Sequence, residues 1–252
     1  MTYIQNRDFL IEVQKGNVAG HSLVHKFGRN DAVANGAWEH VSLLPQTTFL
    51  TAATTVRVKA GNAADTAAGA GAQSITIEGV DSNLVDASEA VETAGGSASG
   101  NTTASFWRVY RSYVTPLRAG AYGGNNTGDV IIENSAGTAD LIKILAGEGQ
   151  TQYGGYTIPT GKTGYLLGVL FTVDASKAAD LRMYMRAAFN DFTTAFAPKL
   201  LKNYWDGIAG VFQFVPRSPI TIAALTDVWF EAQGGGAITE VSVDFEILLV
   251  DD

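Results

Sequence analysis

The chain has 252 residues, 46% of them apolar, which is enough to build the core of one large β domain or of two small ones. Its net charge of −8 comes from 17 basic and 25 acidic side chains. With no basic run to neutralise phosphates, the sequence argues against direct nucleic-acid binding. It has no cysteine and no apolar run near the roughly 18 residues that span a bilayer, so it predicts neither disulfides nor membrane insertion.

The first 50 residues show weak hydrophobic alternation but carry large side chains such as Phe27, Trp38 and Phe49. This contrast predicts an N-terminal arm or small subdomain over 1–50, followed by a β-sandwich domain over 51–252. The opening segment lacks the basic and apolar regions of a secretory signal, which favours assembly in a reducing cytoplasm.

Period-two alternation of apolar and polar residues dominates the rest of the chain and predicts antiparallel strands. The expected strands cover 55–59, 74–79, 106–114, 129–133, 165–173, 181–189, 227–232 and 239–249. Segment 181–189 also contains good helix formers, but its alternation favours a strand. Segment 165–173 is apolar on both faces, which predicts a central strand covered on both sides. The best of the weak helix candidates is 197–205.

Turn residues and low-complexity stretches separate these strands. Pro159 to Lys162 and Gly234 to Gly236 have the composition of hairpin connections. Segments 60–73 and 93–104 consist mostly of small residues. Such stretches form mobile loops or arms that become ordered against a neighbouring subunit, and the composition favours loops.

The residues that could carry catalysis or bind a metal do not form a recognisable motif. The triplet Gly161-Lys162-Thr163 suggests a phosphate-binding loop, which needs a further glycine five residues before Gly161. That position is Tyr156, so a turn is the better interpretation. Three further residues, Glu231, Asp244 and Glu246, could form a glycosidase-like carboxylate pair, but their alternation favours a solvated face. We therefore predict a protein that is not an enzyme.

His21 and His25, four residues apart, could bind zinc from one face of a helix, with His40 as a third ligand. The glycines around them and the absence of a helical stripe favour surface or interface histidines instead. We predict no metal site and no cofactor.

One strand combines aromatic and arginine side chains, a composition typical of interaction hot spots and of carbohydrate platforms. Alternation places Trp107, Arg111 and Tyr113 on one face, opposite a second set, and either face could simply belong to the core. The interface candidates are Phe106, Trp107, Arg108, Tyr110, Arg111 and Tyr113.

Three segments, 79–85 (GVDSNLV), 106–111 (FWRVYR) and 158–165 (IPTGKTGY), resemble a group of structural proteins from tailed phages of aquatic environments, which are encoded among head and tail genes. The resemblance runs from about Val56 to the C-terminus and carries no functional residue. It implies an all-β fold, an antiparallel β-sandwich or jelly roll, that assembles as a homotrimer on the virion.

The composition, the strand pattern and the resemblance together leave three functions from different classes. The first is a capsid decoration or cement protein that binds the major capsid protein lattice, with residues 1–50 as the gripping arm; it would be assembled in the host bacterial cytoplasm and located in the virion. The second is a tail fibre or receptor-binding head that recognises a host surface glycan. The third, least favoured, is a polysaccharide hydrolase with paired carboxylates.

Overall fold

The computed structural model describes residues 8–44, 46–115, 125–192, 198–236 and 238–252. Within these ranges the chain contains one short helix, α1 (Phe9–Gln14), and antiparallel β-sheets. The predicted all-β class is therefore confirmed. No helix in the described ranges is long and apolar enough to cross a membrane.

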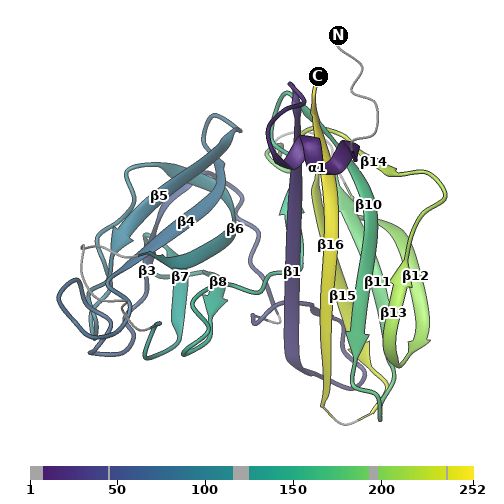
Figure 1. Ribbon diagram of the computed structural model, residues 1–252. Coiled ribbons are helices and arrows are strands. Elements are labelled where there is room, and N and C mark those ends of the chain that lie inside the picture. Colours follow the sequence, from purple (N-terminus) through teal and green to yellow (C-terminus); the bar gives the residue numbers. More distant parts are fainter. Residues whose placement is uncertain (1–7, 45, 116–124, 193–197, 237) are drawn as a thin grey trace.

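The strands form two lobes that lie side by side (Figure 1). The first, which we call the sandwich lobe, contains both ends of the described chain. Its strands are β1 (His21–Val33), β2 (Glu39–His40), β9 (Gly155–Thr157), β10 (Lys162–Val173), β11 (Ala179–Arg186), β12 (Leu200–Ile208), β13 (Gly210–Phe214), β14 (Ile220–Ile222), β15 (Asp227–Gly234) and β16 (Thr239–Asp251).

The order of these strands is that of a jelly roll. One sheet has the order β1-β16-β10-β13, with β14 also paired to β10; the other has the order β12-β11-β15-β2, with β9 also paired to β15. The chain crosses between the sheets at β1–β2, β9–β10, β10–β11, β12–β13, β14–β15 and β15–β16, as in a sandwich built from two Greek keys. The antiparallel sandwich or jelly roll that the resemblance implied is thus the fold observed.

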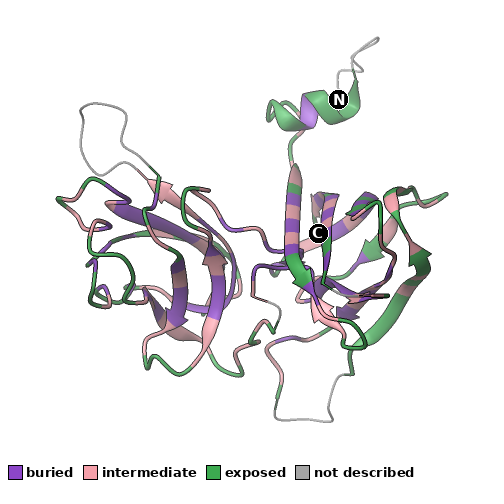
Figure 2. Cartoon of the chain, turned by 90° about the horizontal axis from the view of Figure 1, so that it is seen from below, coloured by how far each residue is buried: buried purple, intermediate pink, exposed green. Residues whose placement is uncertain are grey.

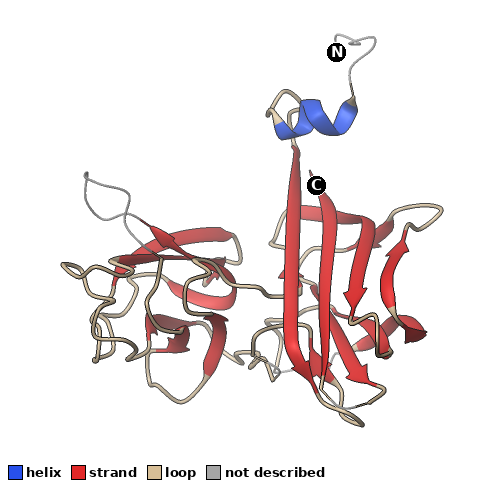
Figure 3. Ribbon diagram, turned by 60° about the horizontal axis from the view of Figure 1, so that its bottom comes forward, coloured by secondary structure: helices blue, strands red, loops and turns tan. Residues whose placement is uncertain are grey.

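The second lobe, which we call the insert lobe, is formed entirely by chain between β2 and β9 (Figure 3). Its six strands have the order β5-β4-β6-β3-β7-β8. The first half of β3 pairs with β6 and its second half with β7, so β3 connects the two parts of this sheet. The strands are β3 (Thr54–Val58), β4 (Ser74–Asp81), β5 (Asp86–Glu92), β6 (Ser105–Thr115), β7 (Val130–Asn134) and β8 (Asp140–Ile144).

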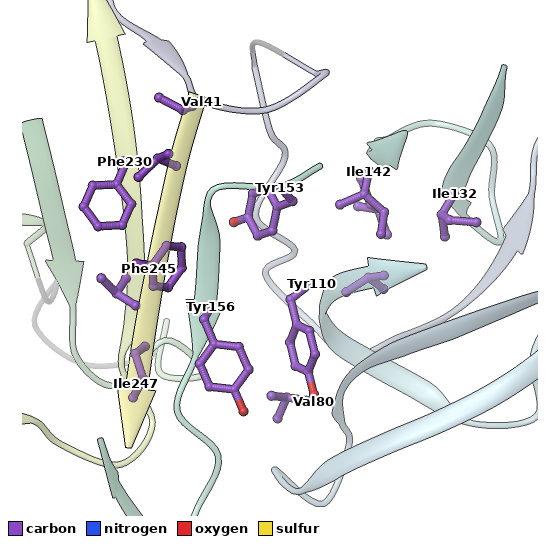
Figure 4. Close-up of a cluster of buried hydrophobic side chains, with 14 of the residues drawn as sticks. Val41, Val80, Tyr110, Ile132, Ile142, Tyr153, Tyr156, Phe230, Phe245 and Ile247 are labelled. Carbon is purple, nitrogen blue, oxygen red and sulfur yellow. The ribbon is translucent and has the colours of Figure 1, made fainter. Parts of the chain in front are cut away.

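A continuous hydrophobic core extends through both lobes. Phe230, Phe245 and Ile247 fill the interior of the sandwich lobe, and Tyr153 lies at the junction (Figure 4). β1 runs so close to this junction that a Cβ atom on Gly28 would lie 2.1 Å from the backbone nitrogen of Gly154. Only glycine fits there without displacing the neighbouring backbone.

Residues 1–50 do not form the predicted separate arm, because β1 pairs along its length with β16, from His21 opposite Val250 to Val33 opposite Thr239. The sequence hid this strand because its inward positions include Lys26, Gly28 and Asn30, which interrupt the apolar pattern. Only α1 and its flanking residues project from the sandwich, as Figure 2 shows. The insert lobe begins near residue 54, close to the predicted boundary at residue 50, and ends near residue 144, where no boundary was predicted.

Two further local predictions concerned regular structure, and they had opposite outcomes. Segment 181–189 is a strand as expected up to Arg186, where β11 ends, and its burial alternates strictly. The helix predicted over 197–205 is wrong where the structure describes it, because Leu200 begins β12; Ala197 itself lies outside the described residues. Pairing with β11 prevails over the helix propensity of the local sequence.

Both predicted hairpins are instead crossings between sheets. Pro159 to Lys162 joins β9, which pairs with β15, to β10, which pairs with β16. The glycines at 234–236 likewise join β15 and β16, which belong to opposite sheets. Turn composition marks a reversal of the chain but not the partner of the next strand, so it could not distinguish these cases.

The strand predicted over 165–173 is central, since β10 lies between β16 on one side and β13 and β14 on the other. Its predicted cover on both faces is wrong. Val169 and Phe171 face the core, whereas Leu170 and Thr172 on the opposite face are exposed.

The two low-complexity segments pack against their own lobe. The carboxylate of Asp65 accepts hydrogen bonds from the backbone N–H groups of Ala72, Thr127 and Gly128 at 2.8–2.9 Å. In the other segment, Thr102 accepts one from the backbone N–H of Val56 at 3.0 Å. Buried polar side chains of these segments thus tie them to backbone groups of the same lobe.

Candidate binding cleft between the two lobes

Strand β6 places four of the six predicted interface residues, Trp107, Arg108, Tyr110 and Arg111, at the junction of the lobes. Its alternation holds except at Val109: Phe106, Arg108 and Tyr110 are buried and Trp107 and Arg111 are half-buried, but Val109, expected on the outer face, is buried as well. Tyr113 is also half-buried. One face of this strand thus belongs to the interior, and its polar groups meet partners in the sandwich lobe.

Arg108 forms a buried ion pair with Asp227 of β15 across the junction. Its Nε lies 3.1 Å from both carboxylate oxygens, and its terminal nitrogen lies 2.9 Å from Oδ2. Thr157 donates a further hydrogen bond to the same carboxylate at 2.7 Å. The guanidinium also lies over the rings of Phe49 and Phe189, at 5.2 and 4.8 Å. Because both charges are paired and removed from water, the lobes are held in one relative orientation.

The half-buried residues of β6 also have partners within the chain. Trp107 stacks on Phe192, with ring centroids 6.4 Å apart. Arg111 lies 3.4 Å from Glu78 and 4.6 Å from the centre of the Tyr113 ring. These contacts account for much of the surface that the sequence assigned to a partner.

Lys26 of β1 is the most perturbed cation in the described part of the chain. Only 7% of it is exposed, and its ammonium donates to the backbone oxygen of Tyr110 at 2.5 Å. Burial lowers its pKa to about 7; the nearby Arg111 acts in the same direction, and Glu78 partly opposes them. The amine therefore changes its charge near neutral pH.

The insert lobe presents Asp86 beside Tyr110, whose ring packs at a tilt against that of Tyr156 in the sandwich lobe. The hydroxyl of Tyr110 donates to Asp86 at 2.9 Å, and the Tyr110 ring lies 4.8 Å from that of Tyr156 (Figure 4). Desolvation raises the pKa of Asp86, against the lowering effect of the hydrogen bond from Tyr110. Burial raises the pKa of both tyrosines, so they are neutral at any ordinary pH.

These groups line a cleft of about 430 Å³ between β1 and the edge of the insert lobe. The volume lies in the range of roughly 300–1,000 Å³ that is usual for small-ligand sites. Its walls combine polar and apolar side chains from both lobes: Ser22, Leu23, Val24, His25, Lys26, Glu78, Asp86, Ala87, Ser88, Tyr110, Arg111, Tyr156 and Leu249. Two predicted interface residues, Tyr110 and Arg111, are among them.

The other cleft residues were not predicted from the sequence, although Lys26 left a signal. It occupies an inward position of β1, and a charged residue at a core position commonly marks a functional or strained site. Recognising it required the pairing of β1 with β16, which brings Lys26 opposite Phe245. Asp86 and Tyr156 gave no signal, because they come together only through the contact of the lobes.

The histidines do not form the zinc site that was considered. His21 and His25 both lie on β1, where residues four apart are separated by roughly 13 Å, too far to share one ion. His25 bonds to Asp244 instead, and His40 lies in the opposite sheet. Within the described ranges no group of three His, Cys, Asp or Glu side chains could hold a metal.

The three carboxylates considered for hydrolysis are also separated. Asp244 and Glu246 lie on β16, whereas Glu231 lies on β15 in the other sheet, so they are not on adjacent strands. Glu231 is buried, and the indole of Trp229 and the guanidinium of Arg182 donate to it at 2.8 and 2.7 Å. These bonds hold its pKa below the usual value despite desolvation.

Gly161-Lys162-Thr163 forms a turn at the start of β10. Lys162 pairs with Asp251 at 2.6 Å, and the hydroxyl of Thr163 donates to Asp252 at 2.6 Å. Both side chains are thus engaged with the C-terminal end of β16.

Comparison with known proteins identifies no family. No family model matches the chain, and no curated protein resembles it in sequence. Among solved structures, one of infectious bursal disease virus (Gx strain) shares 11% identity at a TM-score of 0.27, over 92% of this chain and 71% of that one. A variant VP2 protein of the same virus, in T=1 particles, shares 7% at a TM-score of 0.23, over 98% and 80%.

An Arthrobacter globiformis isomalto-dextranase complexed with panose shares 12% identity at a TM-score of 0.22, over 91% of this chain and 35% of that one. The similarity to viral capsid proteins is therefore weak. At such TM-scores none of these matches supports a conclusion about function.

Proposed function

We propose that this chain is a bacteriophage virion structural protein, a decoration or cement protein that binds the major capsid lattice and stabilises the head. Two observations support it at the level of fold and family: jelly rolls are common in viral capsid proteins, and three segments of the sequence resemble tailed-phage structural proteins. A jelly roll alone also suits lectins, so a local feature has to distinguish the two roles.

The observation that carries the proposal is the apolar surface of α1. Asp8 caps this helix by accepting hydrogen bonds from the backbone N–H groups of Leu10 and Ile11. Phe9, Leu10 and Ile11 are nevertheless 49%, 36% and 54% exposed. Three consecutive large apolar side chains on a projecting element are unfavourable in water and are typical of a docking segment. The gripping role first assigned to residues 1–50 thus falls to α1.

A double variant, Phe9→Glu with Ile11→Glu, tests this assignment. Both side chains are largely exposed, so the fold should be retained while the apolar contact is lost. Virions of the encoding phage, prepared without the protein, would be mixed with the purified chain and sedimented. We expect the wild type and the matched control Val85→Glu, an exposed position on the insert lobe, to sediment with heads. Head binding by the double variant equal to the control would contradict the proposal.

The homotrimer belongs to the same proposal and has its own test. Apolar side chains are exposed on two of the edge strands of the sandwich, including Leu201 on β12 and Val211, which is 72% exposed, on β13. Open apolar edges are unfavourable unless another chain covers them. Light scattering coupled to size exclusion should give 79.8 kDa, three times the chain mass of 26.6 kDa. A mass of 26.6 kDa for the wild type would contradict the trimer.

The position on the particle separates this proposal from its alternative, a tail fibre or receptor-binding head for a host glycan. The open cleft between the lobes favours the alternative, because a protein that recognises a host glycan needs a site where the glycan can bind. Immunogold labelling of intact virions should mark heads. Labelling confined to tail tips would replace the decoration role by the alternative, and unlabelled particles would refute both. We assign no catalysis to the chain in either case.

A further inference from the structure

We propose that the cleft between the two lobes binds one neutral saccharide unit. This goes beyond a role in head stabilisation, because it assigns a small-molecule ligand to a site that head binding does not use. The cleft is open to solvent and is separate from the exposed face of α1: its walls come from β1, β4, β5, β6, β9 and β16.

The walls present both donors and acceptors, as the hydroxyl groups of a sugar require. The ammonium of Lys26 has three N–H donors, and within the described residues it makes one hydrogen bond, to Tyr110. Glu78 and Asp86 supply carboxylate oxygens from the insert lobe, and Ser88 adds a hydroxyl beside them. A ligand with several hydroxyls can bond to both lobes at once.

The same walls carry apolar patches that suit the C–H faces of a sugar ring. Leu23 and Val24 on β1 line one side together with Leu249 on β16, and Ala87 lies across from them on β5. Pockets that combine a few placed polar groups with apolar walls are typical of small-ligand sites.

The charges in the cleft favour a neutral ligand over an ionic one. While Lys26 is protonated, it and Arg111 contribute two cations, and Glu78 and Asp86 contribute two carboxylates, so the formal charges cancel. Arg111 is already paired with Glu78. An anionic ligand would meet the carboxylates and a cationic ligand the amines, whereas hydroxyl groups can bond to either.

The polar groups are held in place before any ligand arrives. The bond from Tyr110 to Asp86 fixes the carboxylate, and the bond from Lys26 to the backbone of Tyr110 fixes the amine. The bond from Lys26 to Tyr110 joins the two lobes, and the Arg108–Asp227 pair holds the same junction, so together they fix the width of the cleft. Preorganisation of this kind reduces the entropy lost on binding.

The test is saturation-transfer difference NMR on the full chain with glucose, galactose and N-acetylglucosamine as neutral probes, and glucuronate and glucosamine as charged ones. Ser88→Trp would fill the cleft from an exposed position on the edge strand β5, so it should not disturb the core. The matched control is Ser97→Trp, an exposed position of the insert lobe outside the cleft.

We expect transfer to at least one neutral sugar with the wild type and with the control, and its loss in Ser88→Trp. Lys26→Met should weaken the binding of the same sugar by about tenfold, as expected for the loss of a charged hydrogen-bond donor. No transfer to any neutral probe, equal transfer in Ser88→Trp, or stronger transfer to a charged probe would each overturn the proposal. These results are independent of the sedimentation experiment, so failure of one proposal is distinguishable from failure of the other.

Discussion

Replacing Lys26 by methionine should abolish a specific pH dependence of stability. Methionine keeps the apolar stem of similar length but removes the buried ammonium and its hydrogen bond to Tyr110. In the unfolded chain the amine is protonated up to its ordinary pKa of 10.5, whereas in the folded protein burial lowers this pKa to about 7. Between these two values the unfolded state binds more protons, so the free energy of unfolding rises with pH.

The size of this effect follows from the two pKa values. Their difference corresponds to about 5 kcal/mol over the whole interval, at about 1.4 kcal/mol for each pKa unit. The destabilisation caused by burying this amine is complete below pH 7 and vanishes above pH 10.5. Between pH 6 and pH 9 the linkage relation raises the free energy of unfolding of the wild type by about 2.5 kcal/mol, and the variant should lack this increase.

Urea denaturation at pH 6, 7, 8 and 9 measures this difference directly. Other groups titrate in both proteins, so the informative quantity is the wild-type value minus the variant value at each pH. Lys15→Met, at a side chain that is 61% exposed, serves as the control and should leave the pH dependence unchanged. Parallel curves for the wild type and Lys26→Met would refute the assignment of a buried, readily deprotonated amine.

Three further predictions concern the junction of the lobes. Asp227→Asn should lower the free energy of unfolding by about 3–5 kcal/mol in urea, because it leaves a buried guanidinium without its counter-charge; a loss under about 1 kcal/mol would contradict the buried pair. Gly28→Ala should cost about 1–3 kcal/mol, measured by thermal unfolding, because its Cβ would overlap backbone atoms; Gly96→Ala, with open space around it, is the control and should cost less than Gly28→Ala. Tyr110→Phe should raise the pKa of Asp86 further in an NMR titration, since it removes a hydrogen bond that lowers this pKa, and an unchanged pKa would argue against that bond.

Four of the ten strands of the sandwich lobe, β10, β11, β15 and β16, were predicted from the period-two pattern that burial on one face imposes. β11 and β16 show this pattern over their full length, and both were predicted. β1 was missed, although it is as long as β16, because its inward face carries a lysine, a glycine and an asparagine. Hydrophobic alternation therefore detects strands whose inward-facing side chains are apolar and misses strands whose inward-facing side chains are polar or absent.

Pairing between strands was less predictable than the strands themselves. The crossings after β9 and β15 have the composition of hairpins, yet each leads to the opposite sheet. In a sandwich the choice between a hairpin and a crossing depends on which hydrophobic faces must meet, and this is a property of the whole fold. The insert lobe was not recognised as an insertion for the same reason, because β1 and β16 come from opposite ends of the chain and pair only in the folded protein.

The candidate site shows the same limit more sharply. The aromatic and arginine side chains of β6 were recognised as unusual, and they do lie at the junction of the lobes. Their partners, Asp227 and Lys26, stand 119 and 84 residues away along the chain. Composition can thus mark one half of a polar contact, but the other half depends on the fold.

The junction also explains why the two lobes should behave as one body in an assembly. If either lobe were separated from the other, Arg108 or Asp227 would lose its counter-charge, and Lys26 would lose the backbone oxygen that accepts its hydrogen bond. Buried charges of this kind contribute little net stability, but they strongly disfavour any arrangement in which they are unpaired. The insert lobe is therefore fixed to the jelly roll by specificity as much as by hydrophobic burial. A rigid body of this kind suits a protein that must present α1 and the cleft between the lobes in a constant geometry.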